Sequence, residues 1–177
     1  ASDVYKRQVV KYADAKVFYP VTRSGRFMEV KAYFEGKTKK EAQPHLEAAS
    51  QKILECESLD ELEGILADCA TELLRIAGGE GGKDDIRNVL RGEDFTGDPV
   101  AELRASVAAA RGERPWTPAL AVALAFRDTY DAVIDRASYG GRHTLGGKDF
   151  DAFVSTLERV GFGPPVESAQ ILSLIHI

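Results

Sequence analysis

The stretch KVFYPVTRSGRFMEVKAYF, residues 16–34, decides the fold that we predict for the first part of this 177-residue chain. Apolar side chains alternate with others on both sides of its centre, which is the period-two pattern of half-buried strands. The intervening segment contains Gly25, a residue suited to a tight turn. We therefore expect a β-hairpin whose inward face carries Met28, Val30, Ala32 and Phe34.

Two amphipathic helices are expected directly after the hairpin. The sequences TKKE (residues 38–41) and SLDE (residues 58–61) match the capping box, in which a hydroxyl and a carboxylate satisfy first-turn amide groups. Apolar residues then recur at helical spacing in both segments. Pro44 conflicts with a helix that begins at Thr38, so the first helix either kinks there or begins near Gln43. The two helices should form an antiparallel pair that covers the inward face of the hairpin.

A glycine run, GGEGG at residues 78–82, follows the helix pair. Four glycines in five residues favour a flexible joint and a domain boundary. Beyond it, apolar periodicity and the start signals Asp98-Pro99 and Thr117-Pro118 predict further helices. These helices are expected at residues 84–91, 99–111, 118–136 and 148–160. The predicted fold class is therefore α+β, with a hairpin packed on a helix pair at 9–77 and a mainly α-helical unit at 83–171.

Both ends of the chain match one DNA element read on opposite strands. The last six residues, Leu172–Ile177, back-translate to a sequence whose reverse complement encodes Asp3–Gln8, and the upstream continuation of that element encodes Ala1-Ser2. The transposon-end adapter used in preparing sequencing libraries has this property. We therefore expect residues 1–8 and 172–177 to be adapter-derived scars, and the remainder to be an internal fragment of a larger protein.

The composition is that of an ordinary folded protein. The chain is 44% hydrophobic and 29% charged, with a net charge of −5 and only two cysteines. These values exclude collagen, a disulfide-rich mini-protein and a wholly disordered chain. No apolar run approaches the ~20 residues of a membrane span, so we expect a cytoplasmic protein with no membrane contact. The charge is uneven, because residues 9–40 are basic and residues 41–77 are strongly acidic.

Nucleotide and metal sites are not expected. The glycine-rich segment 77–84 has alanine and aspartate where a phosphate loop needs glycine and a hydroxyl residue, and it follows a predicted helix instead of a strand. The softer metal ligands, His45, His143, Cys56 and Cys69, are too few and too scattered for a zinc site, and both cysteines lie on apolar stripes. We therefore expect no cofactor. Three acids on one predicted helix are expected to form a solvated, salt-bridged surface with neighbouring arginines: Asp128, Asp131 and Asp135.

The segment RASYGGRH, residues 136–143, places two arginines and a histidine at the predicted end of a long helix. Arginine a few residues before histidine at a helix end resembles the catalytic motif of the HEPN family of ribonucleases. The resemblance covers eight residues and implies RNA cleavage, with His143 as acid or base and Arg136 stabilising the phosphate charge. The polar residue that commonly follows the arginine in that family is Ala137 here. The alternative is a helix C-terminal loop with solvated charges.

A second resemblance concerns the basic hairpin and the segment GKTKKEA, residues 36–42. Over about 30 residues they resemble the small arm-site DNA-binding domain at the front of many tyrosine recombinases. That resemblance implies a sheet in the major groove and phosphate contacts from lysines and arginines. The residues concerned are Arg23, Arg26, Lys31, Lys37, Lys39 and Lys40. No catalytic recombinase motif is present, and lysine-rich edge strands also discourage aggregation.

Taken together, the sequence favours a non-enzymatic binding or assembly module whose partner is another protein or the rest of the parent chain. Such a module should expose an apolar patch of several hundred Å² on one surface. Two alternatives stay open: nucleic-acid binding through the basic hairpin, and a HEPN-like ribonuclease that uses Arg136 and His143.

Overall fold

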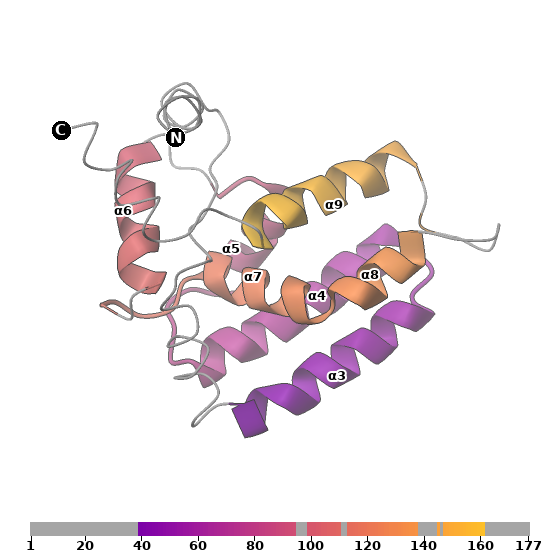
Figure 1. Cartoon of the computed structure of the whole chain (residues 1–177), viewed down its shortest axis with the longest axis horizontal. Helices are drawn as coiled ribbons and strands as arrows, with labels where there is room; N and C mark the ends of the chain where they lie inside the picture. Colours follow the sequence, from indigo (N-terminus) through magenta and orange to yellow (C-terminus); the bar gives the residue numbers. More distant parts are fainter. Residues whose placement is uncertain (1–38, 95–98, 111–112, 138–144, 146, 162–177) are drawn as a thin grey trace, which may run out of the picture.

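The computed structural model describes residues 39–94, 99–110, 113–137, 145 and 147–161, and these residues form helices without any strand (Figure 1). The protein is therefore mainly α-helical, and the expected α+β class is wrong. The residues of the predicted hairpin lie outside the described ranges, as do residues 1–8 and 172–177, whose adapter origin stays a prediction. The described helices are α3 (Lys39–Glu55), α4 (Leu59–Ile76), α5 (Lys83–Arg91), α6 (Pro99–Ala110), α7 (Pro118–Asp128), α8 (Tyr130–Ala137) and α9 (Lys148–Gly161).

The helix pair α3–α4 explains why the predicted class failed. The two helices lie side by side, as the sequence predicted (Figure 1). Their apolar stripes are buried, with Ile53 and Leu62 fully enclosed. The surfaces that cover them belong to helices far along the chain, since α4 packs on α7 and α3 packs on α8. The hairpin was assigned to this face only because it is the neighbouring segment in the sequence, and adjacency in sequence does not decide which apolar surfaces meet.

Local signals placed most helix ends correctly. The side chain of Ser58 accepts a hydrogen bond from the amide of Glu61 at 3.2 Å at the start of α4, and Thr117 does the same for Leu120 at the start of α7. Helix α3 runs unbroken through Pro44. Proline has no amide hydrogen to bond the carbonyl group four residues earlier, but Pro44 is exposed, so solvent can reach that carbonyl. No helix of the described ranges is long and apolar enough to cross a membrane.

The predicted helix at 118–136 is two helices, because the chain turns at Thr129. This residue has φ −108° and ψ 8°, outside the helical range. Its buried hydroxyl donates to the carbonyl of Ala125 at 2.8 Å and so satisfies a group inside the core. The turn directs α8 onto α3, while α7 stays between α4 and α9.

Helix α7 is the buried central helix, as its apolar and alanine-rich sequence predicted. Its small side chains allow neighbouring helices to approach closely. One close approach is at Gly161 of α9, where a Cβ atom would lie 2.8 Å from the ring of Phe126. Helix α9 packs on α7 and α5 through this contact and its own buried stripe.

The glycine run at 78–82 is a packed turn in the structure. Gly78 has a φ of +64°, a conformation that favours glycine. A Cβ atom on Gly79 would lie 2.7 Å from the carbonyl oxygen of Trp116, and the amide of Glu80 donates to that same oxygen at 3.0 Å. Buried residues on both sides of the run belong to one hydrophobic core. The division of the chain into units at this run stays a prediction.

Replacing Gly79 by alanine should lower the free energy of unfolding by about 1–3 kcal/mol, because the new methyl group meets backbone that must move. The matched control is Gly64→Ala within α4, where a Cβ atom meets nothing within 4 Å. That change should raise stability by about 0.5–1 kcal/mol through helix propensity. Urea unfolding followed by circular dichroism measures both. Equal effects of the two substitutions would contradict the packed turn.

Candidate functional site

The structure describes only some of the residues that the sequence suggests as sites. Of the ribonuclease pair, Arg136 is described and His143 lies outside the described residues. Of the basic residues, Lys40 is exposed in the first turn of α3 and Lys39 begins that helix. The remaining four lie outside the described ranges: Arg23, Arg26, Lys31 and Lys37. Both hypotheses therefore stay predictions.

Arg136 has a structural contact of its own. Its guanidinium group donates a hydrogen bond to the carbonyl oxygen of Cys56, which directly follows the last residue of α3. Carbonyl groups at a helix C-terminus lack partners within the helix and carry partial negative charge, so a cation there is favourable. Arg136 thus ties the end of α8 to the turn between α3 and α4. The guanidinium group of Arg159 of α9 lies beside Gly92, the left-handed C-cap of α5, where a Cβ atom would be 2.9 Å from it.

The two cysteines are buried, as their place on apolar stripes predicted. Burial raises the pKa of the Cys56 thiol, although the charge and hydrogen bond of Arg136 oppose that rise. Burial and the negative charge of Asp128 raise the pKa of Cys69 to about 12. The Cys69 thiol donates a weak hydrogen bond to the carbonyl oxygen of His45 at 3.8 Å. Both thiols are therefore protonated near neutral pH, the state in which cysteine is a poor nucleophile.

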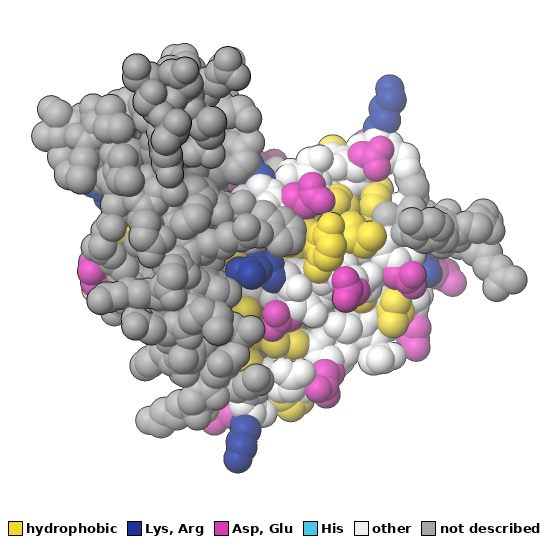
Figure 2. Space-filling view, viewed as in Figure 1, with side chains coloured by type: hydrophobic (Ala, Val, Ile, Leu, Met, Phe, Trp, Pro, Cys, Tyr) yellow, Lys and Arg dark blue, Asp and Glu magenta, His cyan; other side chains and the backbone are white. Residues whose placement is uncertain are grey.

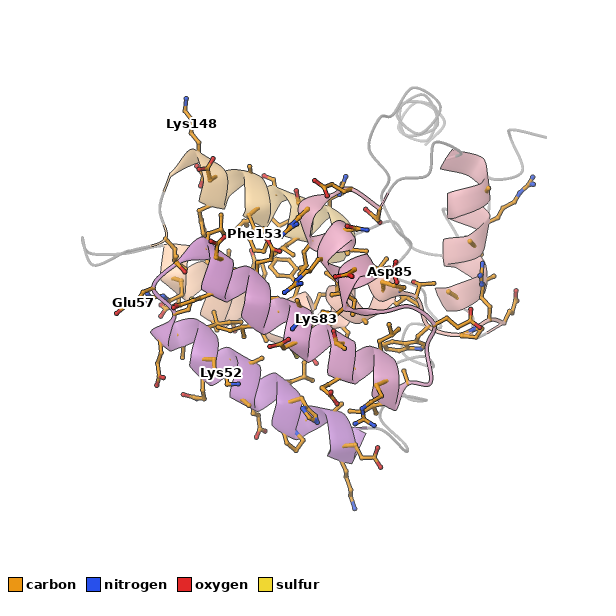
Figure 3. The ribbon with its side chains drawn as sticks, turned by 180° about the vertical axis from the view of Figure 1, so that it is seen from behind. Lys52, Glu57, Lys83, Asp85, Lys148 and Phe153 are labelled. Carbon is orange, nitrogen blue, oxygen red and sulfur yellow. The ribbon has the colours of Figure 1, made fainter. Side chains whose placement is uncertain are left out.

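An apolar patch lies between α8 and α9 (Figure 2). Tyr130 and Ile134 lie one turn apart beside the buried residues of α8, and Val154 lies beside the buried stripe of α9; all three are half-buried. The ring of Tyr130 meets the ring of Phe126 edge-on with the centroids 5.4 Å apart, and Tyr130 and Val154 both pack against the core. The main contact of α8 is with α3, and α9 packs on α7 and α5. The other side of α9 faces the core, where the ring of Phe153 is buried (Figure 3).

Acidic side chains border this patch on both sides. Asp131 and Asp135 follow its two α8 residues directly in the chain, and Asp151 and Glu158 lie one helical turn from Val154 on α9. All four are exposed, and none forms an ion pair within the described part of the chain. Arg136, which the sequence suggested as a partner for these acids, instead bonds Cys56. We call these residues, the three apolar and the four acidic, the α8–α9 patch.

Sequence reasoning missed this patch because Val154 falls within the apolar stripe of α9 and gives no sign of exposure. The signal that was present is the pair Tyr130 and Ile134, one turn apart on a helix that also carries the buried apolar residues Ala132 and Val133. A second apolar stripe on a short helix indicates a second contact surface. A metal site is a poorer candidate, since the described residues bring together no three His, Cys, Asp or Glu side chains able to hold an ion.

No protein-family model, curated protein or solved structure matches this chain. No matching relative therefore supports the resemblance to HEPN ribonucleases or the resemblance to tyrosine recombinases. Function is inferred below from the geometry of the α8–α9 patch.

Arg136→Ala should lower the free energy of unfolding by about 1.5–3 kcal/mol, because it removes a charged hydrogen bond and leaves a half-buried carbonyl unpaired. It should also raise the Cys56 pKa further, since Arg136 lowers that pKa. Arg75→Ala is the control: this side chain is 67% exposed and pairs with Glu72 on its own helix, so the loss should stay below about 0.5 kcal/mol. Equal losses in urea unfolding would show that Arg136 does not hold α8 in place.

Cys69 should make the protein less stable in alkali. Its thiol has a pKa of about 12 in the folded state and an ordinary value of 9.0. The folded state therefore keeps a proton that the unfolded chain loses, and stability falls as pH rises above 9, by up to about 1.4 kcal/mol per pH unit. Urea unfolding of the parent protein and Cys69→Ala at pH 8 and pH 10.5 isolates this effect. The difference in stability between them should shrink or reverse at the higher pH, and a constant difference would contradict the burial of the thiol.

Proposed function

We propose that this chain is a non-enzymatic binding or assembly module, part of a larger protein, that contacts a protein partner through the α8–α9 patch. The observation that carries the proposal is a partly exposed apolar surface between two helices, bordered by exposed acids. Apolar patches rimmed by polar residues are typical of protein interaction sites. The cytoplasmic location expected from the sequence is part of this proposal.

The reactive side chains of the described residues support the same proposal. Arg136 holds the α3–α4 turn, and both cysteines are buried with raised pKa values. These groups are engaged in the fold rather than presented to a substrate. The apolar side chains of the α8–α9 patch, in contrast, are half-buried, so part of each stays accessible.

Selection from a phage-displayed library of short random peptides tests the proposal. The immobilised protein should enrich peptides that lose binding when Ile134 is replaced by glutamate. Val154→Glu, on the other helix, provides a second variant of the same patch. Leu54→Glu is the control, because Leu54 is the exposed large apolar residue of α3 and is 39% accessible.

Circular dichroism should show that all three variants keep the helical content of the parent protein. Loss of binding in both patch variants and its retention in Leu54→Glu is the expected result. Enriched peptides that bind all variants equally, or no enrichment at all, would contradict the proposal.

A further inference from the structure

We infer that the segment recognised by the α8–α9 patch is a basic amphipathic helix of a protein partner, with an apolar stripe flanked on both sides by lysine or arginine. This inference rests on the proposed function and names the chemistry of the partner. It follows from the arrangement of apolar and acidic side chains in the patch, taken together with the absence of strands from the described residues.

The apolar part of the patch fits a helical stripe. Tyr130 and Ile134 are separated by one turn of α8, so their side chains are roughly 6 Å apart along the helix. A partner helix repeats its own apolar side chains at the same interval, at i, i+3 and i+4. An extended peptide would instead need the free edge of a sheet to bond its backbone, and the described ranges contain none. Recognition of a helix by an apolar surface needs no such backbone bonds.

The charges select a basic partner. Asp131 and Asp135 border the apolar side chains along α8, and Asp151 and Glu158 border them along α9. Acidic side chains lie around the apolar surface between the two helices (Figure 2). A helix lying between these two acidic rows would bring cations on both sides of its apolar stripe next to carboxylates. Nucleic acids and anionic lipid surfaces carry negative charge and would be repelled by the same rows. An acidic helix would be rejected for the same reason.

The exposed acids are also available for such pairing. None of the four forms an ion pair in the part of the chain that the structure describes, whereas other carboxylates there do. On α4, for example, Asp68 pairs with Lys83 and Glu63 pairs with Arg91. A partner cation would thus not have to displace an existing ion pair from the α8–α9 patch.

A labelled synthetic peptide provides the test. It has about 18 residues, or five helical turns, with leucine at every third or fourth position and lysine or arginine on both sides. One control peptide has glutamate in place of each cation, and a second has the same composition in scrambled order. Fluorescence anisotropy with the full chain measures binding. The basic amphipathic peptide should bind, both controls should bind at least about tenfold more weakly, and binding should weaken as salt rises.

Charge reversal locates the binding site. The double variant Asp131→Lys, Asp135→Lys should weaken binding of the basic peptide about tenfold or more. The matched control, Glu41→Lys with Glu47→Lys, makes the same change in net charge on exposed positions of α3 and should leave binding within about twofold. Equal losses in the two double variants would show only a general electrostatic attraction and would overturn the inference.

The outcomes also separate this inference from the proposed function. If peptides selected through Ile134 prove neutral or acidic and ignore the Asp131 and Asp135 reversal, the inference fails and the proposed function stands. If no peptide depends on Ile134, both fail. Concentration-dependent dimerisation that Ile134→Glu abolishes in light scattering would show that a second copy covers the patch. That result would overturn the assignment of a basic helix as the partner.

Discussion

The packing of α4 against α7 is the contact on which the rest of the structure depends. Helix α4 buries leucines along its length, and α7 meets it with alanines that permit a close approach. Each fully buried leucine contributes about 1.5–3 kcal/mol relative to an exposed one. Since α3 and α5 pack on α4 while α8 and α9 pack on α7, this pair of helices joins the two halves of the chain into one core. The turn at the glycine run allows the pair to form, because it places Gly79 directly against Trp116.

The positions of the outer helices α8 and α9 depend on contacts at the ends of α7 and with its neighbours. Helix α7 ends before Thr129, whose buried hydroxyl bonds the carbonyl of Ala125, and α8 packs on α3, where Arg136 bonds the carbonyl of Cys56. Helix α9 is held against α7 at the Gly161–Phe126 contact and against α5 near Gly92. Apart from α7, α8 packs on α3 and α9 packs on α5, and the apolar side chains between α8 and α9 stay partly exposed. The α8–α9 patch is thus a consequence of the same contacts that stabilise the core.

Local sequence signals predicted the helices well and their partners poorly. Ser58 and Thr117 marked helix starts correctly, because capping depends only on residues three positions apart. The turn at Thr129 was missed, since a threonine inside a continuous helical pattern gives no local sign that its hydroxyl will bond the preceding turn. The α+β class failed because the surface covering α3 and α4 lies far along the chain. The patch was missed for a related reason: exposure of Val154 depends on where α8 and α9 are anchored, which no local pattern encodes.

Nuclear Overhauser effects between side chains of α4 and α7 measure the central contact most directly. Methyl-labelled leucines of α4 should show cross-peaks to Val122 and to the ring of Phe126, both of which lie in the same core as the α4 leucines. Such cross-peaks, persisting at dilution, are the predicted result. Cross-peaks confined to residues 39–77 on one side and 83–161 on the other would contradict a single core, and with it the position of α8 and α9 that creates the patch.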